Sequence, residues 1–245
     1  MMTRLTDGRI FFGWLVLSAS LLVSFGVIGG QFSFGAFMKP MTEAFGWERA
    51  TLAGAFGVTF MLSGLLRPIA GYLADRYSPK WVALSGVALM GAMLVVLTQV
   101  DNLTQLYVVF SVMALGITLG SGSALAKIVS AWFHRSRGVT LGLLTGGGSI
   151  GAVILVPAAS SFVTWASWRE GYLFLGLFLL ALVLPLGILF IRNKPQDMGL
   201  EPMRPTQQEA ARRTDPSEVL LGRDATFTEA LQTGLFWRLT FGYFV

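Results

Sequence analysis

Two cationic side chains, Arg67 and Lys127, lie inside long apolar stretches of the sequence. Placing a charge within a membrane is costly, so such residues are candidates for binding an anion. Lys127 lies about 7 Å from the end of its stretch, so its stem could instead extend to the interface. Arg67 lies about 12 Å deep and precedes Pro68, so it could instead contact freed backbone carbonyls or the Asp75 region. Both residues therefore have two open interpretations, a structural contact and a role in an anion pathway.

Uncharged side chains that could contact a substrate lie in three of the apolar stretches. A glutamine near the end of the first stretch could hydrogen-bond a carboxylate or close an outer gate, or could be an ordinary interfacial residue. Serines flanked by glycines in the fourth and fifth stretches suit close helix contact first and substrate contact second. The uncharged candidates are Gln31, Phe34, Ser121, Ser123 and Ser149.

Several kinds of chemistry have no support in the sequence. There is no cysteine and only one histidine, His134, so we expect no metal site. The glycines at residues 146–148 lie inside an apolar stretch and lack a following Gly-Lys, which argues against nucleotide binding. All thirteen acidic residues lie in loops or at span ends, so no carboxylate within a span is available to carry a proton. We expect no enzyme active site and no cofactor.

A short charged segment, residues 71–80, separates the second and third apolar stretches. Gly71 would let two helix backbones approach closely. Asp75 could accept hydrogen bonds from the N-terminal amides of a neighbouring helix. Arg76 and Lys80 could hold the segment at an anionic membrane face. The segment is predicted to be a tight turn between two membrane helices, with an ordinary positively charged loop as the alternative.

These residues must be positioned by membrane helices. The chain has 245 residues, of which 54% are hydrophobic and 13% charged, whereas a soluble domain averages about 25% charged. A bilayer span needs about 20 apolar residues, and the first stretch is longer than the ~7–15 residues of a signal peptide. We predict an all-α integral membrane protein. Its predicted spans are residues 11–37, 51–73, 81–99, 106–133, 138–163 and 172–191, with residues 39–49 as a polar connection.

The polar regions predict the orientation. Residues 1–10 form a short N-terminus, residues 192–235 a linker, and residues 236–245 the start of a seventh span, preceded by a capping-box pattern at residues 226–229. Twelve cations fall on one side of the predicted membrane and three on the other. Without the linker the numbers are six and three. The side with more positive charge is predicted to be cytoplasmic, which places the N-terminus and the linker in the cytoplasm. The twelve are Arg4, Arg9, Arg76, Lys80, Arg135, Arg137, Arg192, Lys194, Arg204, Arg212, Arg213 and Arg223, and the three are Lys39, Arg49 and Arg169.

Residues 71–80, Gly-Tyr-Leu-Ala-Asp-Arg-Tyr-Ser-Pro-Lys, resemble the turn between helices two and three of major facilitator superfamily transporters, with Ser78 where glycine is usual. Residues 30–40 are similar to the end of helix one in oxalate:formate antiporters. Residues 132–148 resemble the exit of helix four and the glycine-rich helix five of these antiporters and of monocarboxylate transporters. Residues 192–200 and 229–237 are similar to the helix-six tail and helix-seven entry of bacterial members.

The resemblance implies a fold and a mechanism. Residues 11–191 would be the six-helix N-terminal bundle of a major facilitator fold, built from two inverted three-helix repeats, with the chain ending as helix seven begins. Its partner would be a C-terminal six-helix half. In the family the turn between helices two and three acts as a latch in the outward-open state. That role would fall here to Gly71, Asp75, Arg76 and Lys80.

The expected function is secondary transport of small organic anions, mono- or dicarboxylates, by alternating access. The protein would be a multi-pass component of a membrane, such as a bacterial inner membrane, with the lipid bilayer as its surroundings and no nucleic-acid partner. Residues 11–37 lack the charged residue that animal monocarboxylate transporters carry in helix one. The alternatives are a carrier of another substrate, of the efflux or sugar-phosphate type, and a non-transporting membrane sensor or partner subunit.

Overall fold

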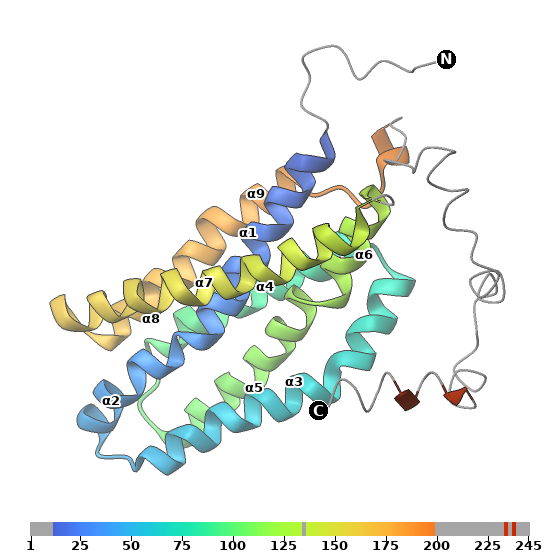
Figure 1. The fold of residues 1–245 in the computed structure, drawn as a ribbon. Coiled ribbons are helices and arrows are strands. Elements are labelled where there is room, and N and C mark those ends of the chain that lie inside the picture. Colours follow the sequence, from blue (N-terminus) through green and yellow to red (C-terminus); the bar gives the residue numbers. More distant parts are fainter. Residues whose placement is uncertain (1–11, 134–135, 199–232, 235–236, 239–245) are drawn as a thin grey trace, which may run out of the picture. The chain divides into compact units, whose positions relative to one another are not determined.

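The computed structural model describes residues 12–133, 136–198, 233, 234, 237 and 238, and within them the chain is helical (Figure 1). Six helical segments are long and apolar enough to cross a membrane, which confirms the predicted all-α membrane fold. The elements are α1 (Phe12–Phe32), α2 (Phe34–Phe45), α3 (Arg49–Arg76), α4 (Pro79–Leu97), α5 (Leu103–Gly120), α6 (Ser123–Trp132), α7 (Arg137–Trp165), α8 (Trp168–Leu177), the π-helical turn η1 (Phe178–Val183), α9 (Leu184–Phe190) and the 3-10 turn η2 (Pro195–Met198).

The first span extends further than predicted, because much of the expected polar connection at residues 39–49 is helical. At the junction of α1 and α2, the Ser33 hydroxyl donates to the carbonyl of Gly29 at 2.8 Å, a bond that competes with the helix ladder. Lys39 pairs with Glu43 one turn later at 3.9 Å, a spacing that supports a helix. The helix ends at Gly46, whose φ of +68° suits a residue without a side chain.

The fourth span is interrupted near its middle. Gly122 separates α5 from α6 and has a φ of +73°, a conformation that glycine adopts readily. The hydroxyl of Ser121 donates to the carbonyl of Ile117 at 2.7 Å and satisfies one of the last acceptors of α5. The first and fourth spans, which would correspond in two inverted repeats, are therefore both broken.

The long helices pack closely where glycines lie at their crossing points. Helix α1 packs along α7, and α5 packs along both α3 and α4, as Figure 1 shows. A Cβ added at Gly86 of α4 would lie 2.1 Å from the backbone nitrogen of Gly120, and one added at Gly29 would lie 2.6 Å from the carbonyl oxygen of Gly151. Backbones this close are typical of membrane helix packing, in which small residues replace the large apolar knobs of soluble proteins.

An arginine connects three segments where α7 meets α8. Arg169 donates to the carbonyl of Thr98 at 2.9 Å and to the carboxylate of Asp101 at 3.0 Å. Its guanidinium also lies 4.4 Å from the ring centroid of Trp168 and 5.6 Å from that of Phe45. Arg169, one of the three cations predicted to lie on the outer side, therefore links the α4–α5 connection to α8.

The sixth span is irregular near its proline. The π-helical turn η1 ends two residues before Pro185, which lacks a backbone N–H. Residues 204–245 form a second compact unit, of which four residues are described. The predicted N-terminus at residues 1–10, the capping box at residues 226–229 and most of the linker and seventh span lie outside the described residues.

Candidate functional site

The charged segment at residues 71–80 is mostly helical. Helix α3 continues to Arg76, and α4 begins at Pro79, a residue suited to the first position of a helix. The turn itself is therefore only Tyr77 and Ser78, shorter than predicted. The last turn of α3 and the first of α4 carry the segment's candidate side chains on rigid elements.

Asp75 forms an ion pair with Lys127 of α6. The ammonium group of Lys127 also lies 3.4 Å from the carbonyl oxygen of Gly71, one turn earlier on α3. The pair is only partly shielded, since 37% of the Lys127 side chain and 72% of the Asp75 side chain remain exposed. The prediction that Asp75 would accept from helix N-terminal amides is wrong for the described residues, because a cation on the neighbouring helix takes that place.

Lys80 does not extend to a headgroup region as predicted. It is 8% exposed, and its ammonium group donates to the carbonyl of Ile188, near the end of α9, at 2.7 Å. Its backbone N–H donates to the side chain of Asn193 at 2.9 Å, and Asn193 in turn donates to Ser78 at 2.9 Å. Lys80 therefore supplies a donor and a positive charge to a helix C-terminus, where both are favourable. Arg76, in contrast, is exposed and contacts only the hydroxyl of Tyr72, at 3.2 Å, among the described residues.

We expect Lys80→Met to destabilise the bundle. Methionine keeps the apolar stem but removes the shorter of the two side-chain hydrogen bonds to the carbonyl of Ile188, leaving only the one from Arg192 at 3.2 Å. Hydrogen bonds to charged groups contribute about 1.5–3 kcal/mol, so a loss in this range is expected in thermal unfolding of the detergent-solubilised chain.

The matched control is Lys39→Met, which removes only an exposed pair with Glu43. That change is expected to stay within about 0.5 kcal/mol of wild type. Equal effects of the two substitutions would show that the contact between Lys80 and α9 does not stabilise the fold.

The other candidates separate into packed and exposed residues. Phe34 is buried, stacks on Phe56 at 4.7 Å between centroids and meets Phe110 edge-on at 5.2 Å, so it is part of the core. Phe56 precedes Asp75 by 19 positions on α3, or about 28 Å, which places Phe34 far from the ion pair. Arg67 is exposed and has no hydrogen bond or ion pair within the described part of the chain. The expected contact of Arg67 with the Asp75 region is therefore not formed.

Gln31 is the buried polar candidate. It is 8% exposed, and its side chain makes no hydrogen bond to any residue that the structure describes. The residue is largely buried, but its amide atoms are not fully enclosed, so they remain open to a ligand or to water. Ser149 is exposed on α7, and Ser123 begins α6 four residues before Lys127.

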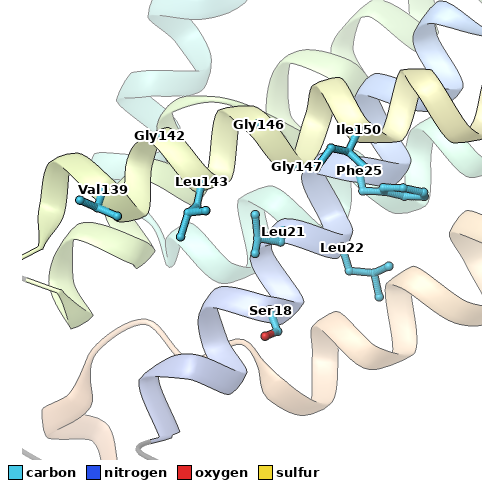
Figure 2. A pocket seen from close by; sticks show the side chains of 10 residues that line it. All are labelled: Ser18, Leu21, Leu22, Phe25, Val139, Gly142, Leu143, Gly146, Gly147 and Ile150. Atoms are coloured by element: carbon cyan, nitrogen blue, oxygen red, sulfur yellow. The ribbon is translucent and has the colours of Figure 1, made fainter.

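Two hollows of different character flank these residues. An apolar groove of about 660 Å³ lies between α1 and α7, with Ser18 the one polar side chain among its ten lining residues (Figure 2). A second pocket of about 810 Å³, which we call the Lys127 pocket, contains three cations and three polar side chains. Its charged and polar lining residues are Ser123, Lys127, Ser130, Arg137, Lys194 and Gln196.

Sequence reasoning missed part of this pocket. Arg137 and Lys194 were counted as charges that set orientation and, like Gln196, lie in segments that resemble the family, but none of them was predicted as a site residue. Ser130 was not singled out at all. Arg137 and Lys194 are separated by two membrane spans in the sequence, so no local pattern relates them. The structure brings Lys127, Ser123, Asp75 and Gly71 together and leaves Gln31 and Phe34 elsewhere in the bundle.

These features define a class of protein. Over the residues that the structure describes, the chain is a polytopic membrane bundle of six apolar segments with broken first and fourth spans and a charged connection between its second and third. The family model described as Major Facilitator Superfamily matches residues 20–245, and the chain belongs to this family of membrane transporters, which are not enzymes.

Similar proteins are transporters from bacteria and animals. The chain is 24% identical to the oxalate:formate antiporter of Oxalobacter formigenes over 94% of its own length and 51% of that protein. It is 26% identical to an uncharacterized MFS-type transporter, YcxA, of Bacillus subtilis over 74% of the chain and 45% of that protein. It is also 26% identical to monocarboxylate transporter 11 of Mus musculus over 81% of the chain and 44% of that protein. The chain spans about half the length of these relatives.

Proposed function

We propose that this chain is the N-terminal half of a secondary transporter that moves small organic anions, mono- or dicarboxylates, by alternating access. The observation that carries the proposal is Gln31, a largely buried residue whose accessible amide lacks a partner among the described residues. Its amide can donate two hydrogen bonds to a carboxylate, and a bound anion would satisfy it. Similarity to the oxalate:formate antiporter along most of the chain supports the same class of substrate.

A second six-helix half would cover the exposed apolar faces of two helices. Helices α3 and α7 expose rows of large apolar side chains, among them Leu65 and Ile69 on α3 and Val153 and Ile154 on α7. In the proposed transporter these rows face the C-terminal half across the substrate pathway. Arg67 and Ser149, exposed on the same two helices, would then belong to the pathway.

The proposed orientation places the Asp75–Lys127 end in the cytoplasm of a bacterial inner membrane. Among the residues that the structure describes, the cations at that end include Arg76, Arg137 and Lys194. In contrast, Lys39 and Arg49 lie near the opposite ends of their spans. The bias toward one end matches the positive-inside rule. The ion pair would then act as a cytoplasmic latch, with Gly71, Arg76 and Lys80 shaping the helix ends around it.

Uptake into proteoliposomes tests this function, using the longest reading frame that contains this sequence. Vesicles loaded with oxalate are expected to take up labelled formate, and unlabelled carboxylates should compete. Gln31→Leu is expected to reduce uptake by about tenfold, the value of one lost hydrogen bond to a charged group. Gln99→Leu is the matched control, since Gln99 is exposed near the end of α4.

Other results would redirect the proposal. Competition by sugar phosphates but not by carboxylates would indicate a carrier of a different substrate. Absence of uptake from a correctly inserted protein, for all of these anions, would favour a sensor or partner subunit. Equal uptake by the Gln31→Leu and Gln99→Leu proteins would remove Gln31 from the binding site.

A further inference from the structure

We propose that the Lys127 pocket is a binding site for a phosphate group, either free in solution or in the headgroup of an anionic lipid. The proposal does not depend on what the protein transports. It rests on the charges that line the pocket, on the contacts that hold its wall and on one hydroxyl without a partner.

Three cations from three different elements line this pocket. Lys127 comes from α6, Arg137 from the first turn of α7, and Lys194 from the segment that precedes η2. Lys127 is neutralised by Asp75. Arg137 and Lys194 have no ion pair with any residue between 12 and 198 that the structure describes. The pocket therefore keeps a surplus of positive charge, which favours an anion of more than one negative charge.

The wall that carries Lys194 is held in place by contacts with two helices, α6 and α4. The indole N–H of Trp132 donates to the carbonyl of Arg192 at 3.0 Å. Asn193 bonds to Ser78 and to the backbone of Lys80 at the start of α4. Pro195 is buried. Because these contacts exist without a ligand, binding would not need to order this segment, which lowers its entropic cost.

Ser130 adds an unexplained polar group. Its hydroxyl is buried and is the one such side-chain atom within the described residues that lacks a hydrogen-bond partner. Buried polar groups are rarely left unpaired, and each exception needs a reason. Serine has a single side-chain torsion, so one change of rotamer reorients this hydroxyl at the wall of the pocket. A ligand oxygen there would supply the missing partner.

The arrangement of donors favours phosphate over a simple carboxylate. One arginine can satisfy both oxygens of a carboxylate in a bidentate pair. Phosphate presents oxygens in several directions, which suits donors that converge from α6, α7 and η2. Gln196 and Ser123 supply further neutral donors on the same lining. The α1–α7 groove, lined almost wholly by apolar side chains, offers no comparable site.

Binding to the 245-residue chain tests the proposal. The chain is placed in nanodiscs of phosphatidylcholine and titrated with inorganic phosphate, with formate as the carboxylate comparison. Phosphate is expected to bind more tightly than formate. The double variant Arg137→Gln/Lys194→Gln should weaken phosphate binding at least about tenfold, as expected for loss of charge-assisted bonds. The double variant Lys39→Gln/Arg49→Gln, far from the pocket, should bind as wild type does.

A second experiment, with lipids, distinguishes the two sources of phosphate. The same proteins are incubated with phosphatidic acid or phosphatidylcholine, and retained lipid is measured by native mass spectrometry. Retention of phosphatidic acid that depends on Arg137 and Lys194, without binding of free phosphate, would assign the site to a lipid headgroup. Binding of free phosphate would assign it to a soluble ligand. The proposal is overturned if neither binds, if formate binds as tightly as phosphate, or if the Arg137→Gln/Lys194→Gln protein binds unchanged while its thermal unfolding matches wild type.

Discussion

Gly151→Ala is expected to force α1 away from α7 and to destabilise the chain strongly for the addition of a single methyl group. A Cβ at this position would lie 2.2 Å from the carbonyl oxygen of Phe25 and 2.8 Å from its Cα. Both are backbone atoms, so no side chain can rotate to make room. The two helices must separate, which breaks the reciprocal approach of Gly29 to the carbonyl of Gly151. The expected loss is about 3 kcal/mol, at the upper end for overpacking.

Thermal unfolding in detergent, followed by circular dichroism, measures this loss. The control lies on the same helix: Gly142→Ala meets no atom within 4 Å. Alanine is the better helix former by about 1 kcal/mol, so this control is expected to stabilise the chain or leave it unchanged. The opposite signs of the two changes are the essential result. If Gly151→Ala unfolds at the wild-type temperature, the close crossing of α1 and α7 is not formed in the protein.

The second large effect concerns the ion pair between Asp75 and Lys127. Lys127→Asp would place two carboxylates where the structure has opposite charges. Like charges in contact repel, and we expect transport by the full reading frame to fall by at least about tenfold. The exchanged pair, Asp75→Lys with Lys127→Asp, restores opposite charges and is expected to recover most of that loss.

Stability measurements on the same variants distinguish a role of the ion pair in conformational switching from a purely stabilising role. The pair is partly exposed, and exposed pairs contribute at most about 1 kcal/mol, so a double-mutant cycle should return a small coupling energy. Transport that falls much further than stability would support a role in switching. An exposed pair, Lys39 and Glu43, provides the comparison, because exchanging its charges should leave both properties unchanged. Failure of the exchanged Asp75–Lys127 pair to recover any transport would contradict the latch.

The lengths of the helices illustrate what sequence patterns can predict. Long apolar stretches indicated all six spans, since a bilayer requires that composition regardless of neighbours. Residues 39–45 were nevertheless predicted as a connection because Lys39, Pro40 and Glu43 are polar or helix-breaking. In the structure Pro40 lies inside α2, and the helix continues to Phe45. Hydropathy marks where a chain can lie in lipid, whereas a helix ends only where its backbone is capped.

The charged residues illustrate what the patterns leave open. Asp75 and Lys127 were each recognised as unusual, one at a helix end and one inside a span. That they pair depends on the packing of α3 beside α6. Lys80 was expected at the membrane face, yet it binds the end of α9, which lies more than 100 residues later. Such partners follow from the arrangement of helices, which a single sequence does not specify.

The sequence by itself determined the membrane class, the number of spans and the family resemblance that the family model confirms. These depend on composition and on short motifs, which act locally. Only the tertiary structure decided which cations are paired, which buried hydroxyl lacks a partner and which residues share a pocket. Arg137, Lys194 and Ser130 illustrate the reason: they lie on separate elements, and the crossing of glycine-rich helices, rather than their spacing in the chain, brings them together.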